Sequence, residues 1–145
     1  MTVTAPTLDA RVIALAHHAA RTLAEGALTR HGVTFHQSVT LRTVAATGGT
    51  LAHQDLVAEV TDALKATAPL IEEVIGELTA AKLLHRQASA LSLTGAGRDL
   101  YETTAAETAA IATRLYAGIP AEDLAVAGRV LTLITARANA ELAAV

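Results

Sequence analysis

The sequence predicts a mainly α-helical protein with one short β-hairpin, assembled from two copies of the chain. Alanine, the residue with the highest helix propensity, occurs 34 times among the 145 residues. Apolar residues recur at steps of three and four over most of the chain, which is the period of one helical face. Because alanine side chains bury little apolar area, the helices make a thin core, and we expect a homodimer to add burial.

Composition and charge exclude several classes of protein. The chain carries a formal net charge of −3 and 52% apolar residues, so it is neither disordered nor broadly basic. It contains no cysteine, which excludes disulfides and thiolate metal sites. No apolar run approaches the roughly 20 residues that span a bilayer, and the first ten residues lack the features of a signal peptide. We therefore expect a cytoplasmic protein with no membrane partner.

The first helix is expected to start after Pro6. A cap at Thr7 or Asp9 would satisfy the free N–H groups of its first turn, and Gly26 or Gly32 marks its end. Steps of three and four separate the residues of its apolar face, which are Leu8, Val12, Leu15, Ala19 and Leu23.

The next two helices are shorter. Thr34 is expected to cap a helix from Phe35 to about Ala46, which the Gly48-Gly49 pair ends. A third helix is predicted from His53 to Leu64. The inward-facing residues of these two helices are Val39, Leu41, Val44, Ala45, Leu56, Val57 and Val60.

A fourth helix and a hairpin follow the turn at residues 65–68. Pro69 fits the first helical turn, where its missing N–H costs nothing, and the helix is expected to run to about Lys82. Its apolar residues are Leu70, Val74, Ile75 and Leu78. Residues 83–86 and 90–94 then look extended, and the second segment alternates apolar and polar side chains. We therefore predict a small two-stranded hairpin, with only residues 87–89 between its strands.

Two long helices complete the chain. The first is predicted from Arg98 to about Ala117, and Gly118-Ile119-Pro120 ends it. Glu122 and Asp123 fall in the first turn of the last helix, where carboxylates complement the helix dipole. The apolar stripe of that helix consists of Ala127, Leu131, Ile134, Ala138 and Leu142. Because the sequence shows no repeat and no linker, residues 1–145 are expected to form one domain.

This order of helices, hairpin and long flanking helices resembles the MarR family of bacterial regulators, and the sequence is similar to a divergent member of it. The matching segments, whose order and spacing together make the resemblance, cover roughly residues 8–142. They are Gly32-Val33-Thr34 with Gln37 and Leu41, Leu56 with Val60, residues 78–86, residues 91–97 and residues 119–124.

The resemblance implies a winged helix-turn-helix fold with long N- and C-terminal dimerisation helices and a short two-stranded wing. Residues 8–31 and 98–145 would supply the dimerisation helices, and residues 34–94 the winged-helix lobe. It also implies a homodimeric transcriptional regulator whose affinity for DNA changes when a small molecule binds between the lobe and the dimerisation helices. The residues expected to contact DNA are Lys65, Thr67, Arg86, Gln87 and Ser89.

The charge of the expected DNA-binding segment departs from the family pattern. Residues 53–85 hold six carboxylates and two lysines, a net charge of −4, and all nine arginines lie elsewhere. Because Lys and Arg neutralise DNA phosphates, Glu72 and Glu73 on the expected recognition helix would repel the DNA backbone. The wing is also short. A second hypothesis therefore stays open: a protein of this fold that has lost DNA binding and acts as a small-molecule-binding protein or a repurposed enzyme.

The expected ligand site lies beside the first two helices. After Gln37 the family usually has a bulky aromatic residue, and Ser38 in this position would leave space for a small apolar or aromatic ligand. The alternatives are that a helix of the partner protomer fills this space and that the histidines are locally satisfied surface groups. The candidate ligand-binding residues are His17, His18, Arg21, Phe35, His36, Ser38 and Arg42.

Catalysis, metal binding and cofactor binding are not predicted. The spacing of the six histidines does not fit the i, i+4 pair of a helical zinc site. No set of nucleophile, base and oxyanion donors is recognisable, so we lean against an enzyme. If the chain is an enzyme, His18 and His36 are the best candidates for a general base.

Overall fold

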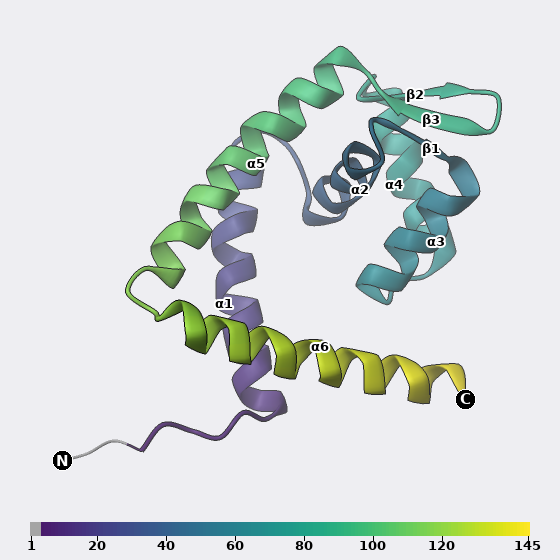
Figure 1. Cartoon of the computed structure of the whole chain (residues 1–145). Coiled ribbons are helices and arrows are strands. Elements are labelled where there is room, and N and C mark those ends of the chain that lie inside the picture. Colours follow the sequence, from purple (N-terminus) through teal and green to yellow (C-terminus); the bar gives the residue numbers. More distant parts are fainter. Residues whose placement is uncertain (1–3) are drawn as a thin grey trace. The chain divides into compact units, whose positions relative to one another are not determined.

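The structure is a computed structural model that describes residues 4–145, so the first three residues of the expected 1–145 domain lie outside it. Over this range the elements follow the order α1–α2–β1–α3–α4–β2–β3–α5–α6 (Figure 1). The described residues divide into two compact units, one that ends at Ile111 and one from Ala112 to Val145. The mainly helical class with a small β-hairpin is confirmed.

Helix α1 (Ala10–Thr29) begins at one of the two predicted caps. The side chain of Asp9 accepts a hydrogen bond of 2.8 Å from the N–H of Val12. Of the α1 residues, only Ala27 and Leu28 are buried in the single chain. Leu15 and Leu23 of the predicted apolar face are 56% and 50% exposed. Most of that face therefore has no covering group in one copy of the chain.

Helices α2 (Phe35–Ala46), α3 (His53–Leu64) and α4 (Ala68–Ala80) enclose the hydrophobic core of the first unit. The predicted bounds of α2 and α3 are confirmed, and α4 ends two residues earlier than predicted. Thr34 and Gln37 form a capping box, in which each side chain accepts a bond of 3.1 Å from the other's N–H. The core residues are Val39, Leu41, Val44, Leu56, Val60, Ile71, Val74, Ile75, Leu78, Leu84 and Leu91.

The predicted hairpin is present and belongs to a three-stranded antiparallel sheet. Strands β2 (Leu84–Gln87) and β3 (Ala90–Leu93) pair over their whole length, with Gln87 opposite Ala90. Strand β1 (Thr50–Ala52), which was not predicted, pairs with the other edge of β3 and gives the order β1-β3-β2. The turn is also tighter than predicted, because Gln87 belongs to β2.

Helix α5 (Gly95–Tyr116) starts three residues before the predicted Arg98, because Thr94 caps it. The hydroxyl of Thr94 accepts a bond of 2.9 Å from the N–H of Gly97 and donates one of 2.7 Å to the carbonyl of Lys82. Gly97 packs so closely on the carbonyl of Leu83 that a Cβ would overlap it. The start of α5 is thus fixed to the junction between α4 and β2.

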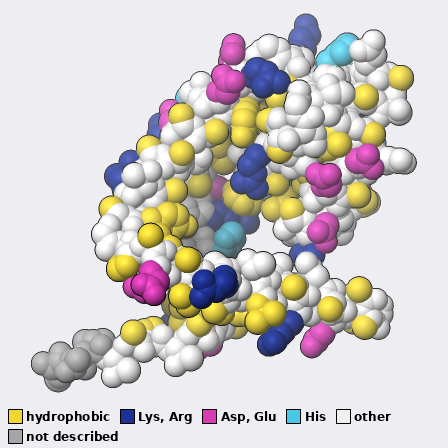
Figure 2. Space-filling view, in the orientation of Figure 1, with side chains coloured by type: hydrophobic (Ala, Val, Ile, Leu, Met, Phe, Trp, Pro, Cys, Tyr) yellow, Lys and Arg dark blue, Asp and Glu magenta, His cyan; other side chains and the backbone are white. Residues whose placement is uncertain are grey.

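Helix α6 (Ala121–Ala143) lies in the second unit and begins with the predicted acidic turn of Glu122 and Asp123. None of its residues is buried in the single chain, and Figure 2 shows apolar side chains at its surface. Its large exposed apolar residues are Leu124, Val126, Val130, Leu131, Leu133, Ile134 and Leu142. No helix within residues 4–145 has the length and apolar character needed to cross a membrane.

Candidate functional site

The wing, defined as β2, β3 and their turn, carries three of the five residues expected to contact DNA. Arg86, Gln87 and Ser89 are all exposed. Arg86 and Ser89 line a hollow of about 390 Å³ together with Ala52, His53 and Gln54 at the start of α3. The structure therefore joins one side of the wing to the N-terminus of α3.

Lys65 and Thr67, the other two expected DNA contacts, lie in the turn between α3 and α4. Lys65 ends α3 in the left-handed conformation, with φ of 51°, and its ammonium lies 2.9 Å from Oδ1 of Asp62. Thr67 is the exposed N-cap residue of α4, and its side chain makes no capping bond. Neither residue lines the hollow beside the wing.

His53 links the wing to α4. Its Nδ1 lies 2.9 Å from Nη2 of Arg86, and its Nε2 lies 2.8 Å from Oε2 of Glu72. Its backbone N–H also donates a bond of 2.8 Å to the carbonyl of Ser89 in the wing turn. His53 was not among the predicted site residues, because its partners lie 19 and 33 residues away and no local spacing connects them.

Two of the six carboxylates between residues 53 and 85 have a bonding partner within residues 4–145. Glu72 accepts a hydrogen bond from the ring of His53, and Asp62 forms an ion pair with Lys65. The other four, Asp55, Glu59, Glu73 and Glu77, are exposed. Figure 2 shows acidic side chains over the α3 side of the first unit. Glu73 therefore remains an outward-facing carboxylate on the expected recognition helix.

A second hollow, of about 330 Å³, lies where α1 ends and α2 begins. Its lining residues are Glu25, Thr29, Gly32, Val33, Thr34 and Phe35. The guanidinium carbon of Arg21 lies 4.0 Å from the centre of the Phe35 ring, and its Nε donates a bond of 2.7 Å to Glu25. An aromatic face, a cation and a carboxylate thus meet at this hollow.

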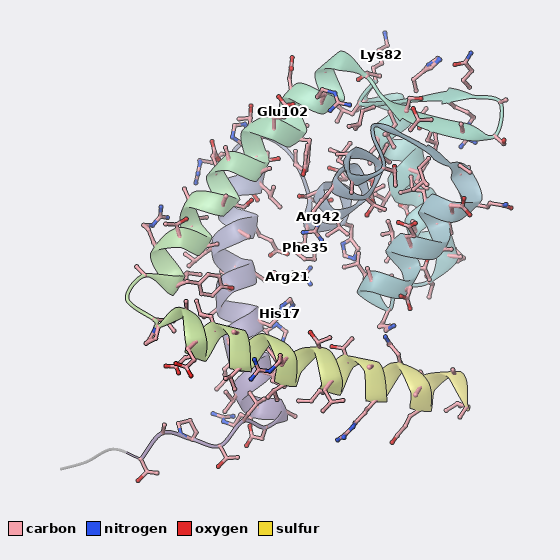
Figure 3. The ribbon with its side chains drawn as sticks, viewed as in Figure 1. His17, Arg21, Phe35, Arg42, Lys82 and Glu102 are labelled. Carbon is pink, nitrogen blue, oxygen red and sulfur yellow. The ribbon has the colours of Figure 1, made fainter. Side chains whose placement is uncertain are left out.

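The structure brings only part of the expected ligand set to this hollow. Phe35 lines it, Arg21 contacts Phe35, and the His36 ring meets the Phe35 ring edge-on at 6.3 Å. His17 and His18 are exposed on α1, and their rings lie 5.5 Å apart. Ser38 is half-buried on α2 and Arg42 is exposed there, while neither lines the hollow. Figure 3 shows His17 and Arg21 on α1, with Phe35 and Arg42 on α2.

Glu25 and Thr29 also line this hollow and were not among the predicted ligand-binding residues. They follow Arg21 at steps of four, so the three residues share one face of α1. That spacing is a signal by which the sequence could have identified them.

An ionic contact next to this hollow holds the end of α1 on α5. Nε2 of His31 lies 2.9 Å from Oε1 of Glu107, and Arg30 lies 3.3 Å from Oε2 of the same carboxylate. The hydrogen bond from His31, with a smaller effect of Arg30, holds the pKa of Glu107 below its ordinary value. Among the described residues, no group of three or more His, Asp and Glu side chains is arranged to hold a metal ion.

Comparison with known proteins identifies the fold. No family model and no curated protein sequence matches the chain. The ligand-free structure of NadR matches with a TM-score of 0.76 and 22% identity, over 92% of this chain and 98% of NadR. NadR in complex with 4-hydroxyphenylacetate matches with a TM-score of 0.73 and 23% identity, over 88% and 95% of the two chains. The Staphylococcus aureus MepR–DNA complex matches with a TM-score of 0.74 and 21% identity, over 87% and 93%.

Proposed function

We propose that this chain, which has the winged-helix fold of the MarR-family regulators, is a cytoplasmic, ligand-responsive transcriptional regulator that binds DNA as a homodimer. The match over 87% of the chain to MepR in a DNA complex is the observation that carries this proposal. The exposed wing residues Arg86, Gln87 and Ser89 support it, because exposed polar side chains on such a wing can reach DNA.

The exposed apolar surfaces of α1 and α6 support the homodimer. Leu15 and Leu23 on α1 are at least half exposed, and α6 buries no residue in the single chain. An exposed apolar helix face of this kind is typical of a protein–protein interface. In this proposal, residues 8–31 and 98–145 form the dimerisation helices and residues 34–94 form the winged-helix lobe.

The hollow beside Phe35 supports a small aromatic acid as the ligand. NadR was crystallised with 4-hydroxyphenylacetate, an aromatic carboxylate. Phe35 lines the hollow and can pack against an aromatic ring there. The guanidinium of Arg21 lies over Phe35 and bonds Glu25 through Nε, so its Nη groups are the ones that can pair with a ligand carboxylate. In this proposal His17, His18, His36, Ser38 and Arg42 contribute from the surrounding surface of α1 and α2.

The DNA part of the proposal is tested by retardation of DNA from the chain's own upstream region at low salt. Binding should fall steeply as salt rises, because it releases counterions from the phosphates. Arg86→Ala should weaken binding by about tenfold, which corresponds to the loss of one arginine contact. His85→Ala on the same strand is the control and should bind like the wild type. A chain that retards no DNA at low salt would overturn the DNA part.

The ligand part is tested by calorimetric titration of the dimer with 4-hydroxyphenylacetate. Arg21→Gln should weaken binding by about tenfold, because the carboxylate loses a charged partner. Arg11→Gln, which changes another arginine of α1, is the matched control. Equal affinity of wild type and Arg21→Gln would exclude Arg21 from the ligand site.

A further inference from the structure

One imidazole, that of His53, contacts both the expected recognition helix α4 and the wing. Its own residue begins α3, Glu72 belongs to α4, and Arg86 belongs to strand β2 of the wing. The side chain of His53 is 21% exposed, whereas that of Glu72 is 50% exposed. Both of its ring nitrogens have partners within 2.9 Å, so each nitrogen of the ring makes a hydrogen bond.

The two bonds require one protonation state of the ring. A guanidinium can only donate, so Nδ1 of His53 must be the acceptor for Arg86. A carboxylate can only accept, so Nε2 must carry the hydrogen that His53 shares with Glu72. The neutral ring with its proton on Nε2 satisfies both partners, and the other neutral tautomer satisfies neither.

The backbone around His53 makes this ring a firm support for the wing. The N–H of His53 donates to the carbonyl of Ser89, and the preceding Ala52 pairs with Ala90 of β3. The main chain of His53 is therefore bonded to the wing independently of the contact between the His53 ring and Arg86. On the other side, Glu72 restrains its rotation by bonding Nε2 with both carboxylate oxygens, at 3.0 and 2.8 Å.

We propose that His53 is the positioning residue for Arg86: it holds the arginine of the wing in the orientation that contacts DNA, with Glu72 fixing the ring. The proposal rests on the proposed DNA binding of the chain. A guanidinium has five N–H donors, so the bond to Nδ1 leaves most of them for phosphate or base. Glu72 then acts as a support for His53 and does not read DNA bases.

Two near-isosteric substitutions separate the contacts of the ring. His53→Asn keeps an acceptor close to the position of Nδ1 and loses the group that reaches Glu72. His53→Gln keeps a polar group near the position of Nε2 and loses the acceptor for Arg86. Each is combined with Arg86→Ala in a double-mutant cycle, which isolates the coupling between the two residues. Circular dichroism of each variant checks that the helices are intact.

The proposal predicts that the effects of His53→Gln and Arg86→Ala on DNA affinity are not additive. His53→Gln should weaken DNA binding by about tenfold, as Arg86→Ala does, and should add no further loss when Arg86 is already alanine. His53→Asn should weaken binding less than His53→Gln does, because it keeps the acceptor for Arg86 and loses only the support of Glu72. Losses that multiply in the double variant, or an Asn variant as weak as the Gln variant, would overturn the proposal.

A second measurement needs no DNA. Nitrogen-15 spectra of the free wild-type chain should show His53 with its proton on Nε2 and a hydrogen-bonded Nδ1. A proton on Nδ1 would overturn the positioning role, since Arg86 would then face a donor. A wild-type chain that retards no DNA would overturn the proposed function instead, and the tautomer would then decide whether His53 holds Arg86.

Discussion

Substitution of Gly97 by alanine is expected to destabilise the protein by about 3 kcal/mol. A Cβ on Gly97 would overlap the carbonyl of Leu83, which also accepts a bond of 3.2 Å from the N–H of Thr94. Residue 97 cannot move away without disturbing the cap of α5, and the Leu83 carbonyl cannot move away without disturbing the end of α4. Overpacking a filled site usually costs about 1–3 kcal/mol, and an overlap with main-chain atoms belongs at the upper end.

Gly76 provides the matched control for this prediction. It lies within α4, and a Cβ there would meet no atom within 4 Å. Gly76→Ala should therefore stabilise the protein by about 1 kcal/mol through helix propensity alone. Both variants are unfolded in urea and followed by helical circular dichroism, at one protein concentration because the stability of an oligomer depends on it. If both midpoints move upward, the close contact of Gly97 with Leu83 is refuted.

Three further predictions concern the pH dependence, the cap and the core. The lowered pKa of Glu107, ordinarily 4.5, gives stability that is complete above the unfolded-state pKa and lost as pH falls through the folded-state pKa. Urea midpoints of the wild type should therefore fall more between about pH 5 and pH 3 than those of Glu107→Gln, and parallel curves would contradict this. Thr94→Val should cost about 1 kcal/mol in thermal unfolding by removing the cap of α5, whereas the exposed Thr103→Val should change little. Leu56→Ala should cost roughly 3 kcal/mol, because Leu56 is 0% exposed in the core, and a urea midpoint equal to that of the wild type would place it outside the core.

The helices of the first unit could be predicted almost to the residue because their end signals are local. Thr34 and Gln37 cap α2 through side chains three residues apart. Gly48 and Gly49, with φ of 82° and 98°, take the conformations that end it. Pro69 lies in the first turn of α4, as its missing N–H requires.

Strand β1 and the start of α5 depend on contacts that are distant in sequence. Thr50 pairs with Ser92, so three residues become a strand because β3 lies beside them. A segment this short shows no alternation that a sequence pattern could reveal. Gly95 and Gly97 look like turn residues, but the cap at Thr94 and the contact with Leu83 make them helical.

Individual residues of the candidate site could be predicted from the sequence, but the contacts between them could not. Arg86, Phe35 and Arg21 were selected by residue type and position, and the structure gives each a specific partner. The count of carboxylates treated Glu72 as a free charge facing DNA, whereas it is bonded to His53. A charge sum along the chain cannot show which charges the fold brings together.

The two-residue turn of Ala88 and Ser89 has a consequence for the length of DNA that each protomer would cover. Each wing strand has four residues, so at about 3.3 Å per residue the wing projects only ~13 Å. A projection of that length spans few phosphates beyond the groove that α4 would enter. If the chain binds DNA as the proposed homodimer, nuclease footprints should show two short protected half-sites with little flanking protection, and the distance between the two copies of α4 would set their spacing.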